Sequence, residues 1–150
     1  MSAGKANRWP KMTGREEFRF LADLVFTRSS GDDTIVSLHD LHSGTTRFAN
    51  NQVVQNVDTR RGTLAVTVAF GRRHGTASTT DFTAGSIHDT LARAERIAQI
   101  SPEDPEYLPP PEPFPFVARE TARPETTAAG PARRLEYANE TISHCRMENL

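Results

Sequence analysis

Hydrophobic and polar residues alternate most regularly between Thr63 and Phe70. One parity carries large apolar side chains and the other carries small or hydroxylated ones, namely Leu64, Val66, Val68 and Phe70 against Thr63, Ala65, Thr67 and Ala69. Successive side chains of a strand point to opposite faces of the sheet. The pattern therefore predicts a strand with one face on a hydrophobic core.

Turn-forming residues divide the stretch 45–81 into successive antiparallel strands. Arg60-Arg61-Gly62 precedes the alternating strand and Gly71-Arg72-Arg73-His74-Gly75 follows it, and glycine permits the positive φ of a hairpin connection. The pair Asn50-Asn51 predicts an earlier turn, because asparagine tolerates the left-handed region. The β-branched-rich run 34–42 predicts a further strand before these.

Two amphipathic helices are expected, one before the strands in the chain and one after them. Thr13 and Glu16 fit a capping box, and apolar residues then recur at helical spacing for about four turns. After the strands, Thr83 and Ser86 compete as the N-cap of a second helix that ends near Ile100. The expected fold class is α+β, with an antiparallel sheet of about four strands and both helices on one face.

Composition divides the chain into segments. Residues 1–12 are polar and aperiodic, and we expect a flexible tail. Residues 13–100 form the expected α+β domain. Residues 101–124 are rich in proline and predict a semi-rigid extended linker. Residues 125–150 are expected to be a C-terminal helical segment, because Gly130-Pro131 can begin a helix.

The expected C-terminal helix has an apolar side that needs cover. Its members repeat at helical spacing, as Leu135, Ala138, Ile142 and Cys145. No chain remains after this helix, so the sequence looks cut short, as the start of a second region. Two alternatives stay open: the helix packs back on the sheet, or it packs on another subunit.

Size and charge exclude several classes of protein. The chain has 150 residues, which suits one domain with tails. Its 18 basic and 19 acidic residues nearly cancel, so charge indicates neither a nucleic-acid binder nor a polybasic membrane protein. A lone cysteine, Cys145, excludes an internal disulfide and fits the cytoplasm. No run approaches the roughly 20 apolar residues that a membrane span needs.

The histidines do not predict a metal site. His39 and His42 are the only close pair, and residues three apart on a strand point to opposite faces. We expect His74 to be a solvated residue of a glycine-flanked turn, with an anion-binding nest as the remote alternative. His88 is expected to be an exposed ring in the first turn of its helix.

The remaining candidate functional residues are also better explained by structural roles. Cys145 follows His144, but adjacent helix positions point about 100° apart, so a buried structural cysteine is favoured over a thiol nucleophile. The pairs Arg60-Arg61 and Arg72-Arg73 lack interleaved aromatic residues, so they are weak evidence for nucleic-acid binding. We therefore predict no catalytic, metal-binding or cofactor-binding residue in this chain.

Four motifs in order carry a resemblance to a known family. They are Arg47 to Gln55 (RFANNQVVQ), Gly62 to Val68 (GTLAVTV), Gly75 to Asp81 (GTASTTD) and the helix that follows. Together they resemble the N-terminal domain of the TldD/PmbA metallopeptidases, also described as modulators of DNA gyrase, over roughly residues 13–105. Asn51 stands where the family usually has glycine, and Thr80 stands where it usually has asparagine.

The resemblance implies a fold and a setting rather than an active site. In the family the zinc ligands lie in the C-terminal half, in an H-E-x-x-x-H helix with a later cysteine, and this sequence ends before that half. The resemblance implies a cytosolic, oligomeric peptidase that encloses peptide substrates, with zinc in the full-length proteins. We expect a non-catalytic domain that supplies scaffold, dimer contacts and chamber wall. The alternative is a free-standing interaction or regulatory module without peptidase activity.

Overall fold

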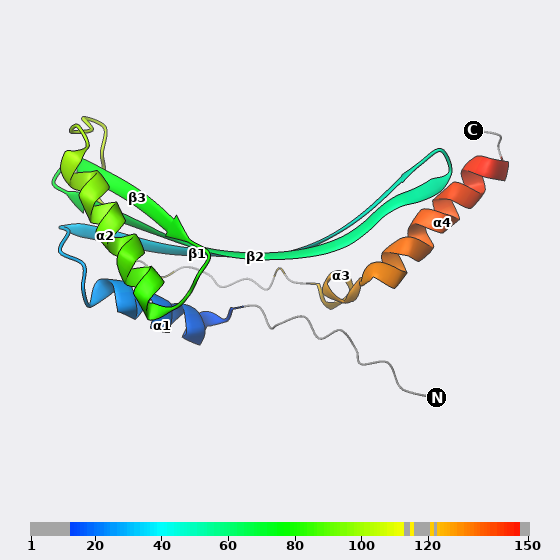
Figure 1. The fold of residues 1–150 in the computed structure, drawn as a ribbon, viewed down its shortest axis with the longest axis horizontal. Helices are drawn as coiled ribbons and strands as arrows, with labels where there is room; N and C mark the ends of the chain where they lie inside the picture. The colour runs from blue at the N-terminus through cyan, green and yellow to red at the C-terminus, as the bar shows by residue number, and fades with distance from the viewer. Residues whose placement is uncertain (1–12, 113–114, 116–120, 122, 148–150) are drawn as a thin grey trace. The chain divides into compact units, whose positions relative to one another are not determined.

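The computed structural model describes residues 13–112, 115, 121 and 123–147. Its elements in chain order are α1 (Arg15–Phe26), β1 (Asp33–Ala49), β2 (Gln52–Phe70), β3 (Arg73–Thr79), α2 (Ala84–Ile100), α3 (Pro124–Ala128) and α4 (Pro131–Met147) (Figure 1). The strands form one sheet in the order β1-β2-β3. The α+β class is confirmed. The tail predicted over residues 1–12 lies outside the described residues.

Residue contacts group the described chain into two units. The core unit comprises residues 13–41 and 61–112, and the hairpin unit comprises residues 42–60 with the described residues from 115 onward. The strands β1 and β2 contribute to both units, because each is long enough to continue from one into the other.

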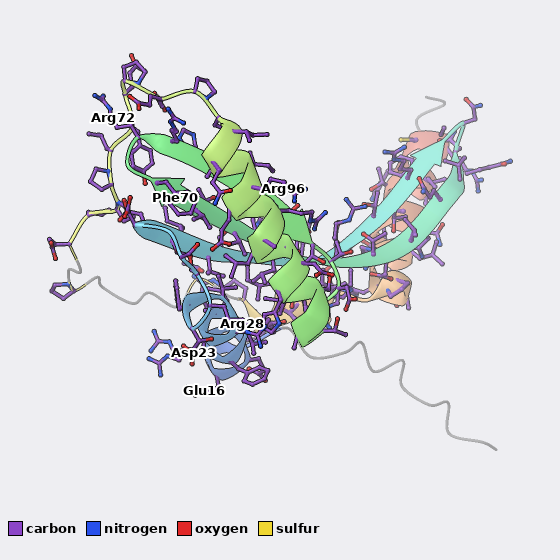
Figure 2. The ribbon with its side chains drawn as sticks, turned by 60° about the vertical axis from the view of Figure 1, so that its left-hand side comes forward. Glu16, Asp23, Arg28, Phe70, Arg72 and Arg96 are labelled. Atoms are coloured by element: carbon purple, nitrogen blue, oxygen red, sulfur yellow. The ribbon has the colours of Figure 1, made fainter. Side chains whose placement is uncertain are left out.

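The core unit buries one face of the sheet beneath α1 and α2 (Figures 1 and 2). The alternation in β2 is confirmed, because its apolar parity lies inside. The buried cluster consists of Leu21 and Val25 from α1, Leu64, Val66 and Val68 from β2, and Ile87, Leu91 and Ala94 from α2. Burial of each large aliphatic side chain stabilises the fold by about 1.5–3 kcal/mol.

The two helix starts differ in how well the sequence predicted them. Thr83 is the N-cap of α2, and its side chain accepts a hydrogen bond from the Ser86 backbone N–H over 3.4 Å, as predicted for one of the two competitors. The capping box predicted for Thr13 is wrong. Gly14 is the N-cap of α1, and Glu17 accepts from its N–H over 3.0 Å. The Thr13 backbone is engaged elsewhere, because its N–H donates to Asp40 over 2.7 Å.

Short turns connect the three strands. Asn50 and Asn51 have φ of 49° and 57°, the two positive values of a type I′ hairpin, so the predicted Asn-Asn turn is confirmed. Between β2 and β3 the turn is Gly71-Arg72, with φ of 57° at the glycine. Residues 73–75, which were predicted to belong to this turn, form the start of β3 instead.

The sheet has three strands rather than about four, because the break predicted at Arg60-Arg61-Gly62 does not occur. β2 continues through Gly62, and β1 continues beyond the predicted end at His42 and through Gly44. These glycines serve close packing: a Cβ on Gly62 would lie 2.8 Å from the Phe82 ring. A Cβ on Gly75 would lie 2.3 Å from the Ala98 backbone nitrogen, so α2 rests directly on β3 there. Gly62 and Gly75 are predicted as turn residues, but in the structure they allow neighbouring elements to approach the strands closely.

The hairpin unit pairs the far ends of β1 and β2 with α4. Ala138 and Ile142 of α4 are buried. Arg146 donates to the Asn51 carbonyl over 2.7 Å, and Asn56 donates to the Pro131 carbonyl over 3.1 Å. These contacts hold both ends of α4 on the hairpin. The structure therefore follows the alternative in which this helix packs back on the sheet.

Candidate functional site

A cluster of polar side chains in the hairpin unit joins α4 to β2. Arg134 donates from Nη2 to Asp58 over 3.0 Å and to Asn56 over 3.4 Å, and from Nη1 to the Ala129 carbonyl over 2.9 Å. The Asp58 side chain is 6% exposed and that of Arg134 is 16% exposed. The two buried charges therefore compensate each other, and Arg134 has two further acceptors.

Residues of β1 complete this cluster. His42 Nε2 lies 3.7 Å from Asp58 Oδ1, on the side of the carboxylate away from the arginine contact. A Cβ on Gly44 would lie 2.3 Å from Arg134 Nη1. Glycine at this position lets the guanidinium lie against the strand backbone, which fixes the direction of the arginine side chain.

A hollow of about 290 Å³ adjoins the cluster. Its lining comes from both strand and helix, as Thr46, Phe48, Arg134, Tyr137, Ala138 and Thr141. We call it the aromatic hollow, because Phe48 and Tyr137 are its large side chains and are 44% and 50% exposed. Arg134 Nε is buried and has no hydrogen-bond acceptor within the described ranges.

A second cluster lies at one end of the sheet in the core unit. His74 of β3 stacks on Tyr107, with ring centroids 5.4 Å apart and an interplanar angle of 22°. The Tyr107 hydroxyl donates to Asp33 over 3.2 Å. Burial raises the pKa of Tyr107, and the charge and hydrogen bond of Asp33 raise that pKa further. His74 Nδ1 lies 3.9 Å from an Asp104 carboxylate oxygen.

The same cluster fixes the segment that follows α2. The Asp104 N–H donates to the Arg72 carbonyl over 2.9 Å, and Arg72 Nε donates to the Asp104 carbonyl over 3.2 Å. Figure 2 shows Arg72 beside this segment. Arg73 lies 3.6 Å from Glu103. Arg72 therefore contacts a backbone carbonyl of this segment, and Arg73 contacts an acidic side chain.

At its centre, the sheet face opposite the helices in the core unit carries small side chains on β2 and β3. Thr67 of β2 and Thr76 of β3 lie opposite each other and share a hydrogen bond of 2.8 Å. Ala65 faces Ser78 in the same register. On β1, Ile35 and Leu41 are exposed. We call this surface the open face. Its small hydroxylated and exposed aliphatic side chains suit it to packing against another surface.

A larger hollow in the core unit, of about 490 Å³, lies beside α1. Its lining is mainly apolar and consists of Thr13, Glu16, Glu17, Phe20, Leu21 and Phe82. Glu17 is already engaged as the cap of Gly14. Polar groups that converge on a ligand are what distinguishes a binding site from an apolar depression, and this hollow presents few of them.

The residues weighed from the sequence do not converge on one site. His39 is exposed on β1, and His88 is partly exposed in the second turn of α2 rather than its first. His74 was expected in a solvated turn, but it lies on β3 and stacks on Tyr107, because the turn ends at Arg72. Cys145 was expected to be buried and is only half-buried, since it lies near the end of α4.

The described side chains do not offer a metal centre. Within residues 13–112, 115, 121 and 123–147, no group of three or more histidine, cysteine, aspartate or glutamate side chains could hold an ion. In the same ranges no helix is long and apolar enough to cross a membrane. Sequence reasoning missed Asp58, Arg134 and Tyr107. No motif in the sequence marked these residues, and the structure places Gly44 within β1 against Arg134.

Comparisons with known proteins give this fold a context. Residues 36–98 match the sequence model described as PmbA/TldA metallopeptidase domain 1. The crystal structure of TldE from Thermococcus kodakarensis superposes with a TM-score of 0.72 over 89% of this chain, at 14% sequence identity. At that identity the likeness shows the fold alone. The chain spans 29% of the length of that TldE chain. No curated protein matches.

Proposed function

This chain contains the N-terminal domain of the TldD/PmbA family of metallopeptidases, and on that premise we propose that it is a non-catalytic domain of such a peptidase. In this role it supplies scaffold, contacts to another subunit and a wall of the substrate chamber. The observation that carries the proposal is the family match over residues 36–98, together with the superposition on TldE.

The surface chemistry of the core unit supports the role of a wall or contact. The open face carries small hydroxylated side chains at Thr67 and Thr76, while Ile35 and Leu41 are exposed on its β1 side. Apolar side chains that a monomer leaves exposed on one face favour contact with another polypeptide. Partners of this kind are a second subunit of the TldD/PmbA type or a peptide held against the sheet.

The described residues do not fit the zinc site that a metallopeptidase needs. Catalytic zinc requires three protein ligands with an open position for water. No such group occurs in the described part of the chain. We therefore derive no hydrolytic step from these residues, and we propose that zinc is held by another part of the enzyme.

The remaining elements of the proposal concern setting. We propose a cytoplasmic protein that forms a homo- or hetero-oligomer with a TldD/PmbA-type subunit and meets peptide substrates there. Nucleic acid and membranes are not proposed as partners. The near balance of 18 basic and 19 acidic residues supports this choice, and Arg73 lies 3.6 Å from Glu103 of its own chain.

Reconstitution with a TldD-type subunit tests the proposal. The purified chain is expected to bind no stoichiometric zinc and to hydrolyse no peptide alone, and to co-elute with that subunit in size-exclusion chromatography. Substitution of Leu41 by Glu on the open face should weaken this complex, whereas Arg19→Glu on the exposed side of α1 should not. Stoichiometric zinc binding with peptidase activity by the chain alone would overturn the proposal.

A free-standing interaction or regulatory module is the second candidate. The exposed Ile35 and Leu41 favour it as much as they favour a chamber wall. The same experiment separates the two functions. A chain that never associates with a TldD-type subunit, yet loses binding to a different protein on Leu41→Glu, is a module of the second kind.

A further inference from the structure

We propose that Trp9 of this chain docks in the hollow beside α1 and thereby holds the N-terminal segment on the core unit. This inference goes beyond the proposed function and does not rest on it. Trp9 lies outside the described residues, whereas the hollow of about 490 Å³ and the start of the chain that leads into it lie within them. The flexible tail predicted for residues 1–12 would then end before Trp9.

Two aromatic side chains form walls of this hollow. Phe20 of α1 is 64% exposed. Phe82, in the connection between β3 and α2, packs partly on the core, and a Cβ on Gly62 would lie 2.8 Å from its ring. The Phe82 ring therefore lies against β2 and forms a fixed wall. A further aromatic ring in the hollow would gain edge-to-face and offset contacts in addition to the area that it buries.

The polar groups of the lining suit an indole better than a small polar ligand. Binding sites for small molecules place several polar groups around the ligand, and this mainly apolar lining presents few. An indole needs a single acceptor, because its N–H is its only polar group. The Glu16 carboxylate can serve as that acceptor, since it belongs to the lining and its side chain is 83% exposed.

Thr13 fixes the point at which the N-terminal segment reaches the hollow. Its N–H donates to Asp40 of β1 over 2.7 Å, and Thr13 itself belongs to the lining. Trp9 lies only four residues earlier, and a chain of that length spans at most about 14 Å. So short a tether gives Trp9 an effective concentration of about millimolar at the hollow, which favours this Trp9 over that of a second copy. Pro10 restricts Trp9 to extended conformations, so less conformational entropy is lost on docking.

The charges of the segment and of the hollow are complementary. Arg8 and Lys11 flank the Trp9-Pro10 pair, and residues 1–12 include no acidic residue. The first turn of α1 carries Glu16 and Glu17, and both belong to the lining of the hollow. Exposed opposite charges contribute little affinity, so the apolar contact supplies most of it and the charges orient the segment.

Fluorescence tests the inference directly, because Trp9 is the only tryptophan of the chain. We expect the full chain to emit at a shorter wavelength than the same chain unfolded in urea, and acrylamide should quench its emission several times less readily. Phe20→Ala should lower the equilibrium constant for docking by roughly two- to tenfold, which is the value of one aromatic contact. The emission of this variant should therefore move towards that of the unfolded chain, and its quenching should increase.

Phe26→Ala is the matched control, because Phe26 is an exposed ring of the same helix that lies outside the lining of the hollow. It should leave the emission and the quenching of Trp9 unchanged, and circular dichroism of both variants verifies that α1 and the core unit are intact. A full chain whose emission and quenching equal those of the unfolded chain would overturn the docking of Trp9. Equal effects of Phe20→Ala and Phe26→Ala would overturn the assignment to this hollow.

Dilution distinguishes docking within one chain from docking between two copies. A contact within the chain does not depend on protein concentration, so the emission of Trp9 should stay the same over a roughly hundredfold dilution. A shift to longer wavelength on dilution would overturn the assignment to the same chain and indicate that two copies exchange their N-terminal segments. These measurements need no second protein, so their outcome leaves the proposed association with a TldD-type subunit to its own test.

Discussion

Arg134 of α4 donates to Asp58 of β2 over 3.0 Å, between residues that are 76 positions apart in the sequence. The contact joins two elements of the hairpin unit by an ion pair of which both members are largely buried. Asn56 and the Ala129 carbonyl accept from the same guanidinium. The pair therefore acts as the principal polar anchor of α4 on the hairpin, alongside the buried Ala138 and Ile142.

Removal of Asp58 should release α4. The variant Asp58→Ala leaves the Arg134 charge buried without compensation, and breaking a buried pair costs about 3–5 kcal/mol. Because Arg134 keeps two other acceptors, we expect the lower end of this range. Hydrogen exchange of the amides in residues 131–147 should accelerate accordingly.

An exposed ion pair on the same helix provides the control for Asp58→Ala. Arg133 and Glu136 lie 2.8 Å apart, and both side chains are more than half exposed. Glu136→Ala should change exchange in α4 by less than about 0.5 kcal/mol, as exposed pairs contribute little. If Asp58→Ala and Glu136→Ala had equal effects, the Asp58 pair would not be the anchor of this helix.

Substitution of Gly75 should be among the most destabilising changes in the core unit. A Cβ there would lie 2.3 Å from the Ala98 nitrogen and 2.5 Å from the Ala94 carbonyl oxygen, and backbone atoms cannot move aside as a flexible side chain can. We expect Gly75→Ala to lower the free energy of unfolding by about 1–3 kcal/mol or more, measured by urea unfolding.

Gly85 of α2 provides the opposite expectation for the same substitution. A Cβ there would meet nothing within 4 Å. Gly85→Ala should leave the free energy of unfolding unchanged or raise it by up to about 1 kcal/mol, because alanine has a higher helix propensity than glycine. Equal losses at both glycines would show that α2 does not rest on β3 as described.

Much of the core unit is predictable from local sequence. The alternation of Leu64, Val66 and Val68 identified the buried face of β2, and Thr83, one of the two N-cap candidates, is the N-cap of α2. These signals are local, because strand facing follows from parity and capping follows from one side chain. The turn at Asn50-Asn51 was predictable for the same reason.

The glycine residues show where prediction from local sequence fails. Gly71 adopts a positive φ and forms a turn, whereas Gly62 and Gly75 lie within strands against Phe82 and α2. The two uses look alike in the sequence, since both place glycine beside a strand. Only the partner element distinguishes a turn from a close contact, and that partner is distant in the chain.

The candidate site was unpredictable for a related reason. Arg134 and Asp58 carry no motif, and each is an ordinary charged residue of a helix or strand. Their burial depends on how α4 packs on the hairpin. The helical spacing of Ala138 and Ile142 shows that α4 has a face to bury, but it does not show which surface covers that face. The His74–Tyr107 contact likewise depends on how the residues after α2 return to the sheet.

Replacing Asn51 in the hairpin turn by glycine should preserve the stability of the turn, whereas replacing it by alanine should lower that stability. Asn51 has a φ of 57°, a region that costs about 1–2 kcal/mol for most L-residues. Asn51→Ala should therefore weaken protection of hairpin amides in residues 45–58 by about 1 kcal/mol, whereas Asn51→Gly should preserve it. Both variants retain the backbone carbonyl to which Arg146 donates. Greater loss with glycine than with alanine would contradict the assigned turn.

Tyr107 should make the fold sensitive to alkaline pH. Burial and the nearby Asp33 raise its pKa in the folded state, so the folded chain holds the phenol proton more tightly than the unfolded chain. The resulting stability is fully present below the unfolded value of about 10 and is lost as pH rises through the folded pKa. Urea unfolding between pH 8 and pH 11 should show this loss. Tyr107→Phe retains the stacking on His74 and removes the ionisable group, so its stability should fall less steeply with pH. Parallel pH profiles for the two proteins would exclude Tyr107 as the source.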